Sequence, residues 1–181
     1  MTAVARAQAV VPLHKRYVDL IFFVYFAFHL LASALVDIQG LVPSNYVPAV
    51  LRDVLQDYLE KSADPLIPST WLPNYIWFRM SLLSEFVIQV PAFLLGMYAL
   101  WHDDRRIYPL LVVYGAIASF TTLQCIATVI MGTERASLTD ANLAFLLQNY
   151  IPFLLIPAWI MVDMVCRIMR ILGPAAHTKA E

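Results

Sequence analysis

The segment IWFRMSLLSEFVIQVPAFLLGMYAL, residues 76–100, decides how this chain folds. It is longer than the roughly 20 apolar residues that a helix needs to cross a membrane. Glu85 and Gln89 are four positions apart, so they share one face of that helix. At 1.5 Å per residue, Glu85 lies about 13 Å beyond Ile76, well below the lipid headgroups. Because a carboxylate at the bilayer centre costs at least about 2.5 kcal/mol, we expect Glu85 to have a function.

Three other segments are comparably long and apolar. The four predicted spans are residues 17–36, 76–100, 107–131 and 141–166. Lipid offers no water to unpaired backbone groups, so only helices or closed barrels cross it, and these segments lack the alternation of barrel strands. The sequence therefore predicts an all-α polytopic membrane protein, a four-helix transmembrane bundle.

The composition agrees with a membrane protein. Of the 181 residues, 61% are hydrophobic and only 14% are charged, whereas about a quarter are charged in soluble domains. The formal net charge is -1 and the basic residues are scattered, so we expect no nucleic-acid partner. Cys125 and Cys166 both lie in apolar segments, where we interpret them as packing residues. We predict no metal site and no cofactor.

Lysine and arginine are unevenly distributed between the two sides of the predicted bundle. One side carries Arg6, Lys15, Arg16, Arg105, Arg106, Arg167, Arg170 and Lys179, and the other carries only Arg52, Lys61, Arg79 and Arg135. The positive-inside rule then places both termini in the cytosol and loop 37–75 in a lumenal or external space. We divide the chain into a cytosolic N-terminal segment (1–16), a single membrane domain (17–170) and a cytosolic tail (171–181).

The first span also has features of a signal peptide. An apolar run follows Lys15 and Arg16 and reaches an A-x-A pattern at residues 32–34. Asp19 would sit badly in a signal-peptide core, and the run is long. We therefore expect a spanning helix.

The loop between the first two spans contains a predicted amphipathic helix. From residue 50 to residue 61, apolar residues recur at helical spacing and charged residues occupy the other face. This lumenal helix either lies on the membrane surface or forms a lid over a cavity, and the sequence leaves both interpretations open. Asp64, directly before Pro65, most simply initiates a turn.

Polar residues of the first span predict a pocket beside Glu85. His29 and Asp37 are eight residues apart, which also brings them near one another around the helix axis. If the first two spans are antiparallel neighbours, Glu85 lies between the levels of Asp37 and His29. Two acids in a low dielectric cannot both stay ionised cheaply, so we expect the pair to share a proton or to bind a cation.

Other spans supply room and further polar groups. Pro91, Pro152 and Pro157 predict bends that leave space between helices. Thr121 and Tyr150 bring hydroxyls, although such side chains in membrane helices more often bond a neighbouring backbone than a ligand. A single histidine with two acids does not make a convincing zinc site.

Several short motifs occur in order along the predicted spans. They are His29, DIQGLVP at residues 37–43, DPL at 64–66, EFVIQVP at 85–91, Thr121-Thr122, and YIPFLLIP at 150–157. Their order and spacing, over most of the chain, resemble the sigma-2 receptor branch of the EXPERA, or emopamil-binding-protein-like, membrane proteins.

The resemblance implies a protein of the endoplasmic reticulum membrane, often a homodimer, whose intramembrane pocket takes up sterols and cationic amphiphiles from membrane lipid. It also implies a role in sterol homeostasis or trafficking. The ligand's ammonium would be held by Asp37 and Glu85, and Asp64 would support the site from the lumenal loop. The other implied ligand-binding residues are His29, Gln89, Thr121 and Tyr150.

The same superfamily includes a sterol isomerase, which shifts a ring double bond by acid–base catalysis. In that enzyme a glutamate follows four residues after a histidine, whereas Ser33 takes that place after His29. The difference favours binding, with no catalytic residue assigned. In an isomerase, Glu85 would donate the proton and Asp37 or His29 would accept one.

Two points remain open at this stage. The chain could instead be a membrane chaperone or trafficking partner whose acids lock helix packing. Residues 179–181 also lack the lysine-rich end of a retrieval signal, so residence in the reticulum depends on the resemblance alone.

Overall fold

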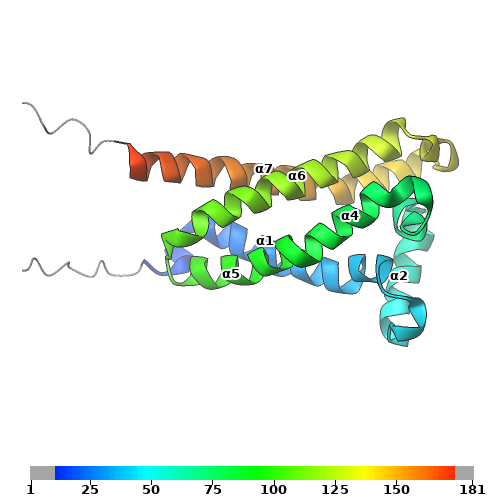
Figure 1. The fold of residues 1–181 in the computed structure, drawn as a ribbon, viewed down its shortest axis with the longest axis horizontal. Coiled ribbons are helices and arrows are strands. Elements are labelled where there is room, and N and C mark those ends of the chain that lie inside the picture. Colours follow the sequence, from blue (N-terminus) through cyan, green and yellow to red (C-terminus); the bar gives the residue numbers. More distant parts are fainter. Residues whose placement is uncertain (1–10, 174–181) are drawn as a thin grey trace, which may run out of the picture.

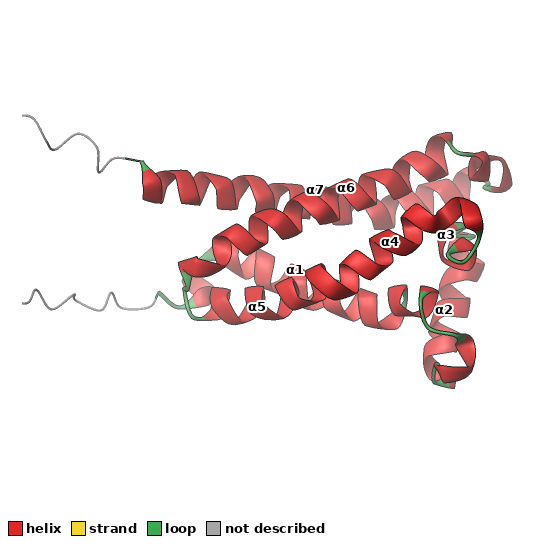
Figure 2. Ribbon diagram, in the orientation of Figure 1, coloured by secondary structure: helices red, strands yellow, loops and turns green. Residues whose placement is uncertain are grey.

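The computed structural model describes residues 11–173 and is built from helices throughout that range (Figure 2). The predicted cytosolic ends, residues 1–10 and 174–181, lie outside the described residues. Four helical stretches are long and apolar enough to cross a membrane, namely Tyr17–Gly40, Pro73–Trp101, Arg105–Met131 and Asp140–Leu172. The predicted four-helix membrane bundle is confirmed, and each observed stretch extends a few residues beyond its predicted span.

The elements follow one another as helices joined by short turns. They are α1 (Tyr17–Leu35), α2 (Ala49–Ser62), α3 (Leu66–Ser69), α4 (Ile76–Ser84), α5 (Val90–Trp101), α6 (Tyr108–Met131) and α7 (Asp140–Leu172). Helix α2 lies at one end of the bundle, and the start of α1 and the end of α7 lie at the other (Figure 1). We call these the loop end and the terminal end.

The spans pack as two pairs. Helix α6 and helix α7 form a long antiparallel hairpin, and α1 packs mainly on α5 (Figure 1). Between α1 and α7 the backbone contact is slight. Asp19 pairs with Arg167 at the terminal end. Along the rest of the seam aromatic rings meet: Phe22 packs edge-on against Trp159 at 5.0 Å, and Phe28 stacks on Phe153 at 6.1 Å. The seam between the two pairs is therefore lined by large side chains.

Gly115 allows the α6–α7 hairpin to pack tightly. A Cβ atom there would lie 2.5 Å from the carbonyl oxygen of Pro157 and 2.8 Å from Cβ of Met161. Small residues at helix crossings let backbones approach in membrane proteins, where apolar side chains gain nothing by leaving lipid. The glycine thus sets the distance between these two helices.

The second span is interrupted where it carries its polar residues. Between α4 and α5, residues Glu85–Gln89 form a π-helical segment, and the N–H of Val90 donates to the carbonyl of Glu85. Pro91 is the second residue of α5. The sequence predicts only that Pro91 disturbs the helix. The structure adds a widened turn just before the proline, and such π segments often mark functional sites.

The predicted amphipathic helix is confirmed as α2, which lies across the loop end of the bundle (Figure 1). Its Leu55 and Tyr58 pack against the bundle core, and Gln39 Nε2 donates to the carbonyl of Leu51 at 2.8 Å. Val50 remains 72% exposed. Helix α2 therefore covers the bundle, as the lid interpretation requires, and keeps an apolar edge available to a membrane surface.

Candidate functional site

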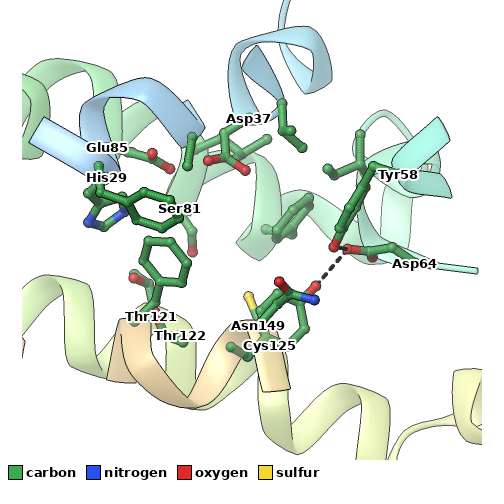
Figure 3. Close-up of a pocket in the computed structure, with 18 residues that line it drawn as sticks. His29, Asp37, Tyr58, Asp64, Ser81, Glu85, Thr121, Thr122, Cys125 and Asn149 are labelled. Carbon is green, nitrogen blue, oxygen red and sulfur yellow. Dashed lines mark hydrogen bonds between the residues drawn. The ribbon is translucent and has the colours of Figure 1, made fainter. Parts of the chain in front are cut away.

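A cavity of about 250 Å³ lies inside the bundle towards the loop end, and residues from α1, α2, α4, α6 and α7 border it (Figure 3). Its lining residues are Phe28, His29, Ala32, Val36, Asp37, Tyr58, Asp64, Ile67, Phe78, Ser81, Leu82, Glu85, Thr121, Thr122, Cys125, Asn149, Tyr150 and Phe153. Most of the wall surface is apolar, and ten of the 18 lining residues also carry a polar side-chain group. Small-molecule sites combine such apolar walls with placed polar groups.

The two predicted acids meet at this cavity. The carboxyl groups of Asp37, just after α1, and Glu85, in the π-helical segment, point toward one another at the cavity (Figure 3). The Ser33 hydroxyl donates to Oε1 of Glu85. Two neighbouring acids in a low dielectric cannot both stay ionised cheaply, which favours a shared proton or a bound cation. The arrangement can therefore exchange that proton for a ligand cation.

His29 borders the same cavity but is held from behind by tyrosines. Its Nδ1 lies 3.1 Å from the Tyr25 hydroxyl and 3.4 Å from the Tyr114 hydroxyl. Its ring packs against Phe93 and Phe153, with both centroids at 4.6 Å. When Nδ1 accepts from a tyrosine, the proton of the neutral ring is on Nε2. The His29 ring is thus held in one orientation as part of the cavity wall, and Nε2 is its remaining polar atom.

Asp64 connects three segments at the loop end. Its Oδ2 accepts hydrogen bonds from the hydroxyls of Tyr58 on α2 and Tyr150 on α7, each at 2.7 Å (Figure 3). Its Oδ1 accepts the N–H of Leu66 at 2.8 Å, so the predicted turn is confirmed. Burial, and then the adjacent Asp64 carboxylate, raise the pKa of Tyr58 above its ordinary value, which keeps this hydroxyl a donor. Asp64 therefore fixes the wall of the cavity.

The remaining predicted site residues divide into two groups. Thr121 lines the cavity, but its hydroxyl donates to Ile117 O at 3.0 Å, as the backbone-bonding interpretation expects. Gln89 is buried in the π-helical segment and is not among the lining residues. Six of the seven predicted residues thus surround one cavity, and Gln89 lies outside that set.

Two residues whose hydroxyls donate to the site's acids, Ser33 to Glu85 and Tyr58 to Asp64, were not predicted as part of the site. Ser33 lies four positions after His29 on the same helix face, so the spacing contained the signal. Tyr58 gave no such signal, because only the docking of α2 brings it to the cavity. Within residues 11–173, no group of three His, Cys, Asp or Glu side chains is placed to hold a metal ion.

The structure is that of a polytopic α-helical membrane protein. It has four apolar spans, an internal cavity that carries two acids, and a short helix over one end. The chain belongs to the EXPERA family (EXPanded EBP superfamily), whose model matches residues 50–164. The matched part begins in α2, so His29 and Asp37 precede it.

Relatives cover most of the chain. It is 27% identical over 158 residues to Sigma intracellular receptor 2 of Xenopus tropicalis, covering 83% of this chain and 89% of that protein. It is 24% identical over 164 residues to the Homo sapiens protein of that name, covering 85% and 90%. It is 26% identical over 147 residues to Efficient mitochondria targeting-associated protein 19 of Saccharomyces cerevisiae, covering 74% and 88%. The resemblance to the sigma-2 receptor branch is confirmed.

Proposed function

We propose that this protein binds sterols and cationic amphiphiles in the cavity between its spans, with the Asp37–Glu85 pair as the polar anchor. The observation that carries the proposal is the meeting of the two carboxyl groups at a mostly apolar cavity. A ligand ammonium replaces the proton between them and leaves its apolar part against the Phe28 and Phe153 rings. Such an ion pair gains strength where water is excluded.

The size of the cavity adds a constraint on the guest. Its volume of about 250 Å³ is below the roughly 300–1,000 Å³ of pockets that enclose drug-sized ligands. A sterol-sized guest therefore inserts its polar end and leaves the rest along the α1–α7 seam, in contact with lipid. The proposal includes residence in the endoplasmic reticulum membrane with cytosolic termini, a homodimer, and a role in sterol homeostasis or trafficking.

Binding of a fluorescent hydrophobic tertiary amine to the purified full chain tests the anchor. Asp37→Asn and Glu85→Gln should each weaken binding by at least about 30-fold, because removing one partner of a buried charge pair costs 2–5 kcal/mol. The matched controls are Asp53→Asn and Glu60→Gln, which neutralise exposed acids of α2. Circular dichroism and gel filtration establish that each variant folds. Unchanged affinity in both folded cavity variants would discard the anchor.

The alternative is a sterol isomerase that uses the same cavity. The observation in its favour is that His29 borders the cavity together with both acids, so an acid and a base could flank a carbocation. Analysis of products after incubating purified protein with candidate sterols distinguishes the two functions. A shifted double bond that disappears in Glu85→Gln would favour the enzyme.

A further inference from the structure

A second hollow, of about 470 Å³, lies at the terminal end of the bundle, away from the candidate site. The start of α1, the α5–α6 connection and the end of α7 meet there (Figure 1). Its charged lining residues are Arg16, Arg105, Arg167, Arg170, Asp19 and Asp103. With four positive and two negative side chains, the lining has a surplus of two positive charges. We call this hollow the terminal groove.

Arg16 and Asp19 form a fixed part of the groove wall. The Arg16 guanidinium pairs with Asp19 and donates to the carbonyl of Leu100 and, at 2.9 Å, to that of Val11. The two side chains are only 13% and 5% exposed. Arg16 therefore has its donors engaged by the protein itself.

Arg167 is held in the same way from α7. It lies 2.6 Å from Oδ1 of Asp19 and 2.6 Å from Oδ2 of Asp163, and its guanidinium sits over the Tyr108 ring at 5.5 Å. Neither contact has the angles of a hydrogen bond, so Oδ1 of Asp19 and Oδ2 of Asp163 interact with Arg167 as ion pairs only. Arg167 thus shares one acid with Arg16 and completes a rigid frame.

Arg105 and Arg170 are the groove's unpaired cations. Both are exposed and line the groove. Neither has an acidic oxygen within 4.0 Å among residues 11–173. They come from opposite walls, the α5–α6 connection and the end of α7. Two guanidinium groups without acidic partners therefore border the same space.

The groove lies at the level expected of lipid headgroups. Tyr17, which lines the groove, is 74% exposed, and Trp101, the last residue of α5, is 59% exposed. Exposed aromatic side chains at the ends of spans mark the membrane–water interface. An anion reaching Arg105 and Arg170 there comes most directly from the lipid itself.

We propose that the terminal groove binds the phosphate of an anionic phospholipid headgroup between Arg105 and Arg170. Guanidinium forks match phosphate oxygens in pairs, and basic pockets between transmembrane helices recognise such headgroups. Arg16 and Arg167, neutralised by their acids, position the site. The proposal is independent of the internal cavity and its acids.

The proposal is tested by titrating the purified full chain with dioctanoyl phosphatidic acid and measuring the bound lipid by native mass spectrometry. The wild-type chain should bind this lipid at least about tenfold more tightly than dioctanoyl phosphatidylcholine. The double variant R105Q/R170Q should lose at least about tenfold more affinity than the control K15Q/R106Q. The control removes two exposed charges from the same end without touching the groove lining.

Each outcome decides the assignment. Equal losses in the two double variants would show diffuse surface attraction and overturn the site. Competition by inorganic phosphate at the lipid's own concentration would overturn the lipid assignment. If R105Q/R170Q fails to fold, R105K/R170K decides, because it keeps both charges but loses the forks. A several-fold loss then supports the site, and no loss refutes it.

Discussion

The Asp64 side chain accepts three hydrogen bonds. Their donors are the hydroxyl of Tyr58 on α2, the hydroxyl of Tyr150 on α7 and the N–H of Leu66. The carboxylate is buried, so these bonds have no water to replace them. An asparagine has one acceptor oxygen and would direct an amide N–H at one of the donors. A carboxylate is therefore required at position 64, and an asparagine of the same shape cannot replace it.

We predict that Asp64→Asn lowers the free energy of unfolding by about 1.5–3 kcal/mol, the usual range for hydrogen bonds to a charged acceptor. Amide hydrogen exchange in α2 should accelerate, because the link to Tyr58 is weakened. Thermal unfolding in detergent and exchange mass spectrometry measure the two effects. Asp57→Asn, on the exposed face of α2, serves as control, and an equal effect there would contradict this role.

The polar residues of the site were predictable to different degrees. Glu85 and Asp37 stand out because ionisable groups are costly in apolar spans, and the antiparallel arrangement of neighbouring spans brings them together. The turn at Asp64 follows from the proline after it. Its tyrosine partners do not, because Tyr58 and Tyr150 meet only after α2 docks on α7. Burial of Gln89 beside the cavity, rather than on its wall, depends on the π-helical segment.

At the level of elements, the α6–α7 hairpin depends on backbone contact at Gly115. The nearest atom to an added Cβ is the Pro157 carbonyl oxygen, which belongs to the backbone and cannot rotate away. Overpacking of a tight interface typically costs about 1–3 kcal/mol. Helix propensity acts in the opposite direction, since alanine is favoured over glycine by about 1 kcal/mol.

We predict that Gly115→Ala lowers the stability of the protein in detergent despite the better helix propensity of alanine. The net loss should reach up to about 2 kcal/mol, measured by chemical unfolding with tryptophan fluorescence as the signal. The neighbouring Ala116 is exposed, so Ala116→Leu should change stability by less than about 0.5 kcal/mol. A stabilised Gly115→Ala variant would show that the helices are not in tight contact there.

Span positions followed from the lengths of the apolar segments, and the amphipathic helix followed from its spacing. The π-helical segment did not, because Pro91 can be accommodated by a bend, a 3₁₀ turn or a widened turn, and neighbouring helices select among these. The pairing of α1 with α5 and of α6 with α7 likewise depends on side-chain packing between spans.

Across the whole molecule, α7 is joined to the N-terminal part of the chain at both ends of the bundle. Asp19 links α1 to Arg167 of α7 at the terminal end, and Asp64 links the first loop to α7 at the loop end. Between these links the two helices meet through rings. The charge bias along the sequence predicted which ends of the spans lie together, but it did not predict that acids and arginines at one end would pair.

We predict that Asp19→Asn lowers the free energy of unfolding by about 1.5–3 kcal/mol, the usual range for hydrogen bonds to charged groups. Arg16 and Arg167 lose their shared acid but keep Asp103 at 3.5 Å and Asp163 at 2.6 Å. Thermal unfolding of the full chain measures the change. Asp104→Asn is the matched control at the same end. The Arg106 side chain lowers the pKa of Asp104 to about 2, but this pair is exposed and screened by water, so no measurable loss is expected.

The aromatic seam between α1 and α7 has a kinetic consequence. Phe28 is 59% exposed and stacks on Phe153, which itself faces the cavity. Turning one exposed ring about its χ angles takes nanoseconds, whereas parting two helices takes microseconds or longer. Under the proposed binding function, a rotation of the Phe28 side chain would admit a guest from the bilayer while the helices stay packed. Heat resistance and the speed of guest turnover should then be tunable separately.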